Sequence, residues 1–335
     1  MGEPMDKRYG WVVIGMLTLG LTACSSGGWK TWNWNWWSKP VVKEAPPPRV
    51  MTTRQQKLTP FTEFEADGWF DIDLIQDTKH YSVSIQGYND IIEHVQPVVK
   101  DGVLHLHMDR PYGKAEEQQI HVIIRMPTLR HIRYSGDATI RAEKLETGYL
   151  DVDMRRGGDL RLGGRVALHD VRIAGAARLH ISDVNSNDLH LFLGGNAQLE
   201  LDGNIRVTEI VAADDSSLRL NWVDAPMLRA TITQHAKVTL AGRVGLLQAN
   251  VFHEATLDAK YLRADRAFVK TYHNGLAEIN TIKSRSTLAR HESNIYYYSD
   301  SDFEGDFMAN DGTVMDMQQM YLVDHMGFPL LSGNG

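Results

Sequence analysis

Three histidines near the C-terminal end of the chain stand at spacings that could bring their imidazoles together. His253, His273 and His291 follow one another at intervals of 20 and 18 residues, and a glutamate directly follows two of them. Imidazole and carboxylate groups on one edge could hold a transition metal or change charge near a pH of about 6.5. Metal ligands must converge on one point, however, whereas side chains in a straight column diverge. We therefore favour a solvated column of polar side chains over a metal site.

An acidic segment with the oxygen ligands that calcium prefers comes next. Asp300, Asp302 and Glu304 alternate along it, and Gly305 follows. A carboxylate at every second position with a glycine at the sixth is similar to a calcium-binding loop. Glu304 departs from that pattern, and Asp311 stands where the loop needs a glutamate. A solvated acidic rim is the favoured interpretation, and a calcium site is the alternative.

Three consecutive tyrosines precede the acidic segment. If Tyr296, Tyr297 and Tyr298 lie on a strand, at least one phenol points outward. Exposed aromatic rings can stack on sugars or on partner proteins. Packing at the end of the fold is the equally open alternative.

The single cysteine, Cys24, excludes an internal disulfide and a cysteine-ligated zinc site. It follows a basic start and an apolar run, Trp11 to Ala23, whose 13 residues are too few to cross a membrane. Such a run is typical of a secretory signal. The sequence Leu21-Thr22-Ala23-Cys24 resembles the bacterial lipobox. The resemblance implies cleavage before Cys24 and a lipid on its thiol; the alternative is a plain signal peptide with a chance cysteine.

The residue after the cysteine bears on the membrane to which a lipoprotein is sorted. Ser25 is not an aspartate, and by resemblance to Gram-negative lipoproteins it does not signal retention at the inner membrane. We therefore expect a protein anchored to the outer membrane through its lipid, on either the periplasmic face or the cell surface.

A segment rich in tryptophan and proline follows, and we interpret residues 24–57 as a tether. Indoles favour the membrane interface, so they could form a second anchor there, or they could make a linker that packs on protein. The tryptophans concerned are Trp29, Trp32, Trp34, Trp36 and Trp37. The triplet Pro46-Pro47-Pro48 would hold the folded part away from the surface.

From about residue 128 the chain repeats itself every 18 to 20 residues. Each unit has one apolar residue that can be followed from unit to unit, and most units have a turn-forming or polar residue four positions earlier. The apolar residues are Ile140, Leu160, Leu179, Leu199, Leu218, Val238, Leu257, Ala277, Ile295 and Val314. Apolar residues alternate with period two within the units, which indicates strands. This pattern predicts an all-β fold, a parallel β-helix or β-solenoid.

Residues 58–127 differ from the repeat and read as an N-terminal β-rich capping segment, with one short helix expected over 91–98. Aromatic and apolar residues stand there in a characteristic order, continued by a Met-Pro step and a Ser-Gly pair. The motifs are Phe61-x-x-Phe64, Phe70-Asp71-Ile72, Tyr81-x-Val83-x-Ile85-x-Gly87, Asp101-Gly102-x-Leu104 and Met126-Pro127-x-Leu129. This order resembles the GIN domain, the head of autotransporter adhesins, over about 58–317. The resemblance implies a β-helical envelope protein and supplies no catalytic residues.

The predicted organisation follows from these segments. It comprises a signal peptide at 1–23, the lipidated tether at 24–57, the β segment at 58–127, the solenoid at 128–317 and a C-terminal cap or tail at 318–335. Solenoids need caps because an open end exposes both core and strand edges.

Composition and motifs narrow the function. The formal charge of −7 disfavours nucleic acid as a partner. No motif typical of catalysis stands out, so we expect neither an enzyme nor a cofactor, although β-helices include carbohydrate-active enzymes. We expect a lipid-anchored envelope protein whose non-catalytic solenoid binds a protein or glycan or serves as a scaffold. A structural subunit of an outer-membrane secretion complex is the alternative.

Overall fold

Alternating apolar and polar residues build nearly all of the fold, because each apolar side chain that points inward is followed by one that points outward. The computed structural model describes residues 49–108, 120–137, 139–298, 303–308 and 311–318. These residues belong to one compact unit, Pro48–Gly335. None of the helices among them is long and apolar enough to cross a membrane.

The first part of the described chain contains antiparallel pairs and one short helix. Its elements are β1 (Met51–Lys57), β2 (Glu63–Asp67), β3 (Asp71–Gln76), β4 (Ser82–Tyr88), α1 (Asn89–Ile92), β5 (Val95–Lys100), β6 (Val103–Met108) and β7 (His121–Met126). Strand β4 pairs antiparallel with β1 and β7, and β5 pairs antiparallel with β6. Strands β2 and β3 run parallel to β8 and β9 of the solenoid, and so connect the two parts into one sheet.

Two segments of this part differ from the sequence expectation. The helix expected over 91–98 is wrong for most of its length: α1 ends at Ile92, and Val95–Lys100 is a strand. Val95 and Pro97 are buried while Gln96 and Val98 are exposed, which is the period of a strand. Strand β1 lies inside the range assigned to the tether. Its side chains are nearly all exposed, so no apolar pattern marks it, and pairing with β4 makes it a strand.

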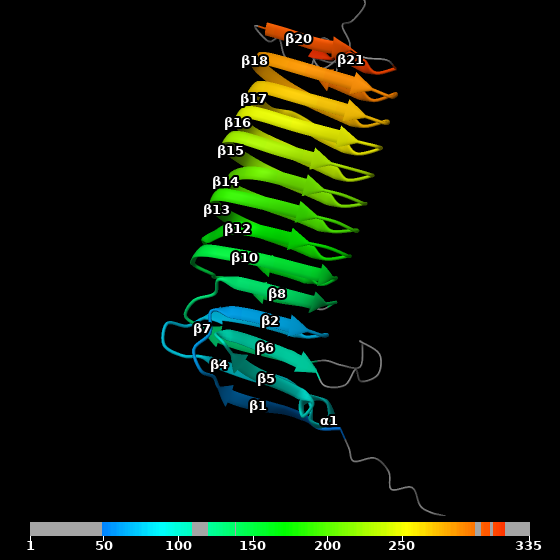
Figure 1. The fold of residues 1–335 in the computed structure, drawn as a ribbon. Helices are drawn as coiled ribbons and strands as arrows, with labels where there is room; N and C mark the ends of the chain where they lie inside the picture. The colour runs from blue at the N-terminus through cyan, green and yellow to red at the C-terminus, as the bar shows by residue number, and fades with distance from the viewer. Residues whose placement is uncertain (1–48, 109–119, 138, 299–302, 309–310, 319–335) are drawn as a thin grey trace, which may run out of the picture. The chain divides into compact units, whose positions relative to one another are not determined.

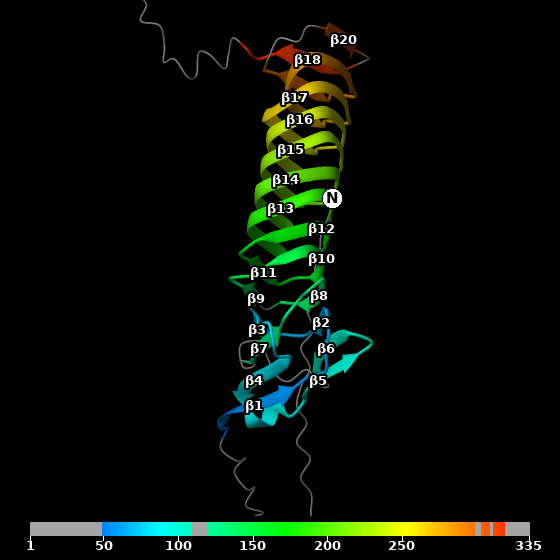
Figure 2. The ribbon, with the colours of Figure 1, turned by 90° about the vertical axis from the view of Figure 1, so that its left-hand side faces the viewer.

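The rest of the described chain winds into coils that stack with parallel strands (Figure 1, Figure 2). Its strands are β8 (His131–Gly136), β9 (Thr139–Ala142), β10 (Thr147–Arg156), β11 (Asp159–Leu162), β12 (Val166–Ile173), β13 (Arg178–Leu193), β14 (Gln198–Ala212), β15 (Ser217–Ile232), β16 (Lys237–Phe252), β17 (Thr256–Tyr272), β18 (Leu276–Arg290), β19 (Asn294–Tyr297), β20 (Phe303–Met308) and β21 (Thr313–Asp316). The predicted parallel β-solenoid, with a β-rich N-terminal segment, is confirmed.

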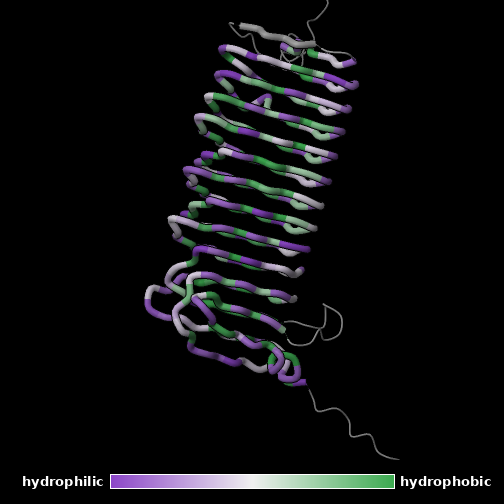
Figure 3. Tube along the Cα trace, viewed as in Figure 1, coloured by the Kyte–Doolittle hydropathy of each residue, from purple (hydrophilic) through white to green (hydrophobic). Residues whose placement is uncertain are grey.

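The apolar residues tracked through the repeat stand directly beside one another in the structure. Ile140 pairs with Leu160, Leu160 with Leu179, and each further member pairs with the next, as far as Val314. From Ile140 to Ile295 they are at most 2% exposed, so they form one column of a continuous core. Hydrophobic and hydrophilic residues alternate along every coil (Figure 3).

A column of left-handed turn residues lies four positions before these core residues. They share positive φ angles between 51° and 73°, and they are Arg156, Gly175, Gly195, Asp214, Gln234, His253, His273 and His291. Glycine adopts this conformation without strain, and Asn, Asp and His tolerate it better than most other residues. The turn-forming residues of the repeat therefore mark the corner at which each coil bends.

Candidate binding surfaces

The three histidines expected to form a column do so, at the left-handed corner. The ring centroids of His253 and His273 are 5.6 Å apart with planes inclined by 17°, and those of His273 and His291 are 4.6 Å apart and inclined by 3°. Parallel rings place their nitrogens one above another and do not aim them at one point. The described residues contain no group of three or more His, Cys, Asp or Glu side chains that could hold a metal ion. The geometry is that of a stacked polar column.

The tyrosines expected on a strand end lie in and beside β19. The guanidinium carbon of Arg285 lies 3.4 Å from the ring centroid of Tyr297, and Arg285 itself is 1% exposed. The hydroxyl of Tyr298 donates to Glu278 Oε1 at 2.6 Å. Partial burial and this bond raise the pKa of the Tyr298 phenol above its usual range. Tyr296, like its two neighbours, is half-buried. Tyr297 and Tyr298 thus have partners within the chain, which agrees with packing at the end of the solenoid.

Asp311 of the acidic segment is exposed, with a φ of 65°. The remaining residues singled out in the sequence lie outside the described side chains. They are Leu21, Thr22, Ala23 and Cys24, the five tryptophans from Trp29 to Trp37, and Asp300 and Asp302. Glu304 lies in β20, of which only the backbone is described.

A cluster of aromatic and acidic side chains on the solenoid was not found from the sequence. The hydroxyl of Tyr149 lies 3.1 Å from Asp151 Oδ2 and 3.1 Å from His169 Nδ1. The rings of Tyr149 and His169 stack at 5.0 Å, and His190 meets His169 edge-on at 5.6 Å. Burial and the Asp151 carboxylate together raise the pKa of the Tyr149 phenol. The repeat spacing between Tyr149 and His169 is a signal for this column, but register shifts in β10 obscure it.

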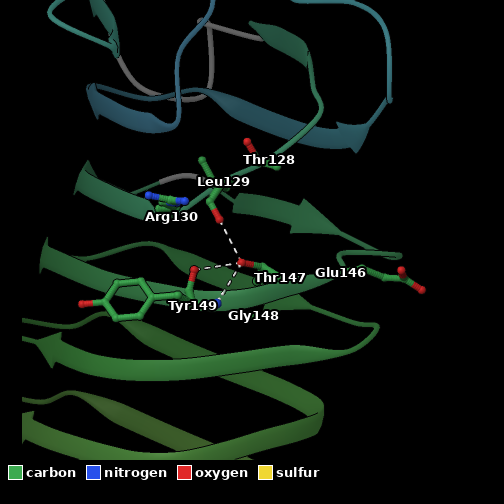
Figure 4. Close-up of a pocket in the computed structure, with 7 residues that line it drawn as sticks. All are labelled: Thr128, Leu129, Arg130, Glu146, Thr147, Gly148 and Tyr149. Atoms are coloured by element: carbon green, nitrogen blue, oxygen red, sulfur yellow. Dashed lines mark hydrogen bonds between the residues drawn. The ribbon is translucent and has the colours of Figure 1, made fainter.

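The cluster borders a hollow of about 510 Å³ where the N-terminal segment meets the solenoid. Residues 128–130 and 146–149 line it (Figure 4). The Thr147 hydroxyl lies 3.1 Å from the carbonyl oxygen of Leu129 and 2.8 Å from that of Tyr149. This hydroxyl ties adjacent coils together at the hollow, and the phenol of Tyr149 projects away from it (Figure 4).

Acidic side chains on the nearby strands are paired with arginines two residues further along the same strand. Asp153 pairs with Arg155 at 2.6 Å, Asp159 pairs with Arg161 at 2.6 Å, and Arg172 pairs similarly with Asp170 at 2.8 Å. Residues two apart share a face of a strand, so these pairs decorate the outside of the solenoid. They give these faces mixed charge.

One further aromatic residue missed in the sequence stands out. Trp222, at a corner within β15, is 75% exposed and has a φ of 65°. Exposed large aromatic side chains stack on planar or ring-shaped groups of a partner. The strand pattern places Trp222 on β15 but does not reveal its backbone conformation or its exposure.

Comparison with known proteins connects this architecture to one family. The family described as "Putative auto-transporter adhesin, head GIN domain" matches residues 60–204 and again residues 189–301. The matches cover both the N-terminal segment and the solenoid, and they fall within the region that resembles a GIN domain. None of the curated proteins matches the sequence.

Several solved structures are similar to this chain. A "putative adhesin" from Parabacteroides merdae is 15% identical, with a TM-score of 0.43, over 79% of this chain and 95% of that chain. A "putative lipid binding protein" from Parabacteroides distasonis is 14% identical, with a TM-score of 0.46, over 79% of this chain and 96% of that chain. A "putative adhesin" from Bacteroides fragilis is 18% identical, with a TM-score of 0.35, over 81% of this chain and 98% of that chain.

Proposed function

Because this chain belongs to the family of auto-transporter adhesin head GIN domains, we propose that it is a lipid-anchored protein of the cell envelope that binds a protein or glycan through its solenoid. The adhesin-like β-helix provides the platform, and the tether holds it at the membrane. Its role is recognition and not catalysis.

The observation that supports a binding platform is the continuous core column of the solenoid. The tracked core residues remain side by side from Ile140 to Val314, and they are buried from Ile140 to Ile295. A continuously packed core holds the outward-facing residues at fixed positions. Side chains from successive coils, such as Tyr149 and His169, therefore present a prearranged surface to a partner.

The anchor is proposed from the first residues of the chain. Leu21-Thr22-Ala23-Cys24 provides the processing motif, the thiol of Cys24 takes the lipid, and Ser25 permits transfer to the outer membrane. The lipid anchors the protein without a membrane-spanning segment, because its acyl chains are buried in the bilayer. The tryptophans of the tether add a second contact at the membrane interface.

Replacing the cysteine tests the anchor. Cys24→Ser is expected to abolish incorporation of a clickable palmitate analogue and to move the protein from the membrane fraction to the soluble fraction. Ser26→Ala, two residues away, is the matched control and should leave palmitate incorporation and membrane association unchanged. Palmitate labelling of the Cys24→Ser protein would overturn the assignment of Cys24.

The binding role is tested by affinity capture of the full chain from detergent-solubilised envelopes, combined with protease treatment of intact cells. A recovered envelope or host-surface component, with the protein cleaved on intact cells, supports the adhesin-like role. Protection from protease together with a stoichiometric membrane complex would replace that role with structural participation in a secretion machine. Cleavage of any member of a glycan panel by the purified chain would overturn the non-catalytic assignment.

A further inference from the structure

Trp222, the most exposed aromatic side chain among the described residues of the solenoid, has a left-handed backbone conformation. Its φ of 65° is a conformation that bulky residues rarely adopt, and the side chain is 75% exposed. Asp183, Gly203 and Gly242 stand at the same place in other coils, four residues after the core column, and also have positive φ, so the bend of the coil sets this conformation. An indole this exposed adds little to the core and is open to a partner.

The neighbouring coils leave space around the indole. Gly203 and Gly242 occupy the corner of the coils on either side, with φ angles of 136° and 132°. A Cβ at either position would lie 2.2 Å from a backbone carbonyl oxygen, so only glycine fits. With no side chains at these two positions, the corner forms a shallow hollow of about 550 Å³ beside Trp222.

A second exposed aromatic ring lies further along the same corner. Trp222 directly precedes Val223, which pairs with Gly242, and Ala241 just before that glycine pairs with Tyr261. Tyr261 is 54% exposed. Adjacent strands are about 4.8 Å apart, so the backbones of the two residues stand about 10 Å apart along the solenoid axis, with the coil of Ala241 between them.

Polar and charged groups line the hollow beside the indole. Asn204, Asp224 and Arg243 contribute to its wall, and all three are exposed. In the column beside the aromatic rings, Asp224 pairs in register with Arg243, and Arg243 pairs with Arg263. The surface thus combines two aromatic rings with hydrogen-bonding groups and with the cationic groups of Arg243 and Lys260, whose Nζ lies 5.7 Å from the centroid of the Tyr261 ring.

We propose that Trp222 and Tyr261 form a binding surface for a carboxylated glycan whose chain runs parallel to the solenoid axis. Two sugar rings stack their C–H faces on the two aromatic platforms. Asn204 and Asp224 bond the hydroxyl groups, and Arg243 pairs with a uronic carboxylate. The two-coil separation spans about two sugar units. This inference rests on the proposed binding role and gives it a ligand class and a location.

The direct test uses the full chain in detergent micelles and a hexamer of galacturonic acid as the probe, with cellohexaose as the neutral probe of equal length. Calorimetry should show binding of the acidic hexamer that is at least tenfold tighter than binding of the neutral one. Hydroxyl-radical footprinting read by mass spectrometry should show protection of Trp222 and Tyr261 by the acidic hexamer. Absence of protection at Trp222 would overturn the proposal.

Variants separate this surface from the rest of the solenoid. Trp222→Asn, which tolerates the left-handed backbone, should weaken hexamer binding at least tenfold without lowering the thermal unfolding midpoint. Tyr261→Ala and Arg243→Gln should each weaken it severalfold. Phe268→Ala is the matched control, because Phe268 is a 48% exposed aromatic residue elsewhere on β17. Full affinity in Trp222→Asn would overturn the proposal.

These experiments distinguish failure of the glycan surface at Trp222 from failure of the proposed binding role. If no acidic glycan binds but the full chain still captures an envelope component, the proposal for Trp222 falls and the binding role stands. Protection of Trp222 by a captured protein, or by anionic lipid vesicles, would also overturn the glycan assignment and replace the ligand class.

Discussion

At the solenoid corner, the left-handed backbone conformation restricts which residue types occur. Eight residues four positions before the core column have positive φ, and they include glycines, an aspartate and three histidines. Histidine is among the residues that tolerate this conformation. The backbone therefore accounts for His253, His273 and His291 standing in one column, and their stacking follows from the repeat.

A glycine at the corner and a glycine elsewhere should respond differently to an added methyl group. Gly175 has a φ of 73°, and a Cβ there would lie 2.2 Å from the carbonyl oxygen of Arg156. We expect Gly175→Ala to lower the free energy of unfolding by about 1–3 kcal/mol through backbone strain. Gly148→Ala is the control, because nothing lies within 4 Å of its Cβ position. Equal urea midpoints for the two variants would contradict the prediction.

Titration of Tyr298 offers a second prediction for a single residue. Burial and the bond to Glu278 raise the folded-state pKa of its phenol above the ordinary value of 10.0. The stability associated with this shift is present below the unfolded-state pKa and is lost as pH rises through the folded-state pKa. In a phenolate absorbance titration, the difference between the native protein and Tyr298→Phe should show one late-titrating phenol. Glu278→Gln should lower the pKa of this phenol, so that it titrates at lower pH. An unchanged titration curve would refute the role of Glu278.

At the scale of the strand, inward and outward neighbours have opposite energetic roles. Leu218 is 1% exposed and pairs with core residues of the strands on both sides, whereas Arg219 points outward. Removing a buried leucine side chain loses hydrophobic burial and leaves a cavity.

Alanine substitution at these adjacent positions tests this difference. We expect Leu218→Ala to lower the free energy of unfolding by about 2–5 kcal/mol. Arg219→Ala should change it by less than about 0.5 kcal/mol, as exposed substitutions usually do. Urea denaturation followed by circular dichroism provides the comparison, and a similar loss for both variants would argue against the inward placement of Leu218.

At the scale of the whole solenoid, each coil contacts mainly the coils on either side, so stability should be local along the stack. The C-terminal coils contribute the last buried member of the core column, Ile295, which pairs with Ala277 of β18. They also place Tyr297 against the buried Arg285. The last coils therefore cover groups that water would otherwise reach.

Ending the chain after Glu292 removes Ile295 and Tyr297 and should expose Ala277 and Arg285, which they cover. The solenoid should then loosen from that end. We expect amide hydrogen exchange to rise most in β18, less in β17 and little in β14, because each coil is supported by its neighbours. Met315→Ser, at a 45% exposed position in β21, is the control and should leave exchange in β18 unchanged. A uniform rise over all coils would show that the solenoid unfolds as one unit.

The sequence by itself determined the all-β solenoid, the register of its core column from Ile140 to Val314, and the corner four residues before it. These features could be predicted because burial imposes a period of two along each strand, and stacking imposes a period of about twenty along the chain. Only the tertiary structure decided that Met51–Lys57 is a strand and that Val95–Lys100 is not helical, since pairing with distant strands supplies their order. It likewise decided which outward side chains meet. The contact of Tyr149 with His169 and the exposure of Trp222 depend on register shifts and on the direction of single side chains, which the repeat spacing alone does not specify.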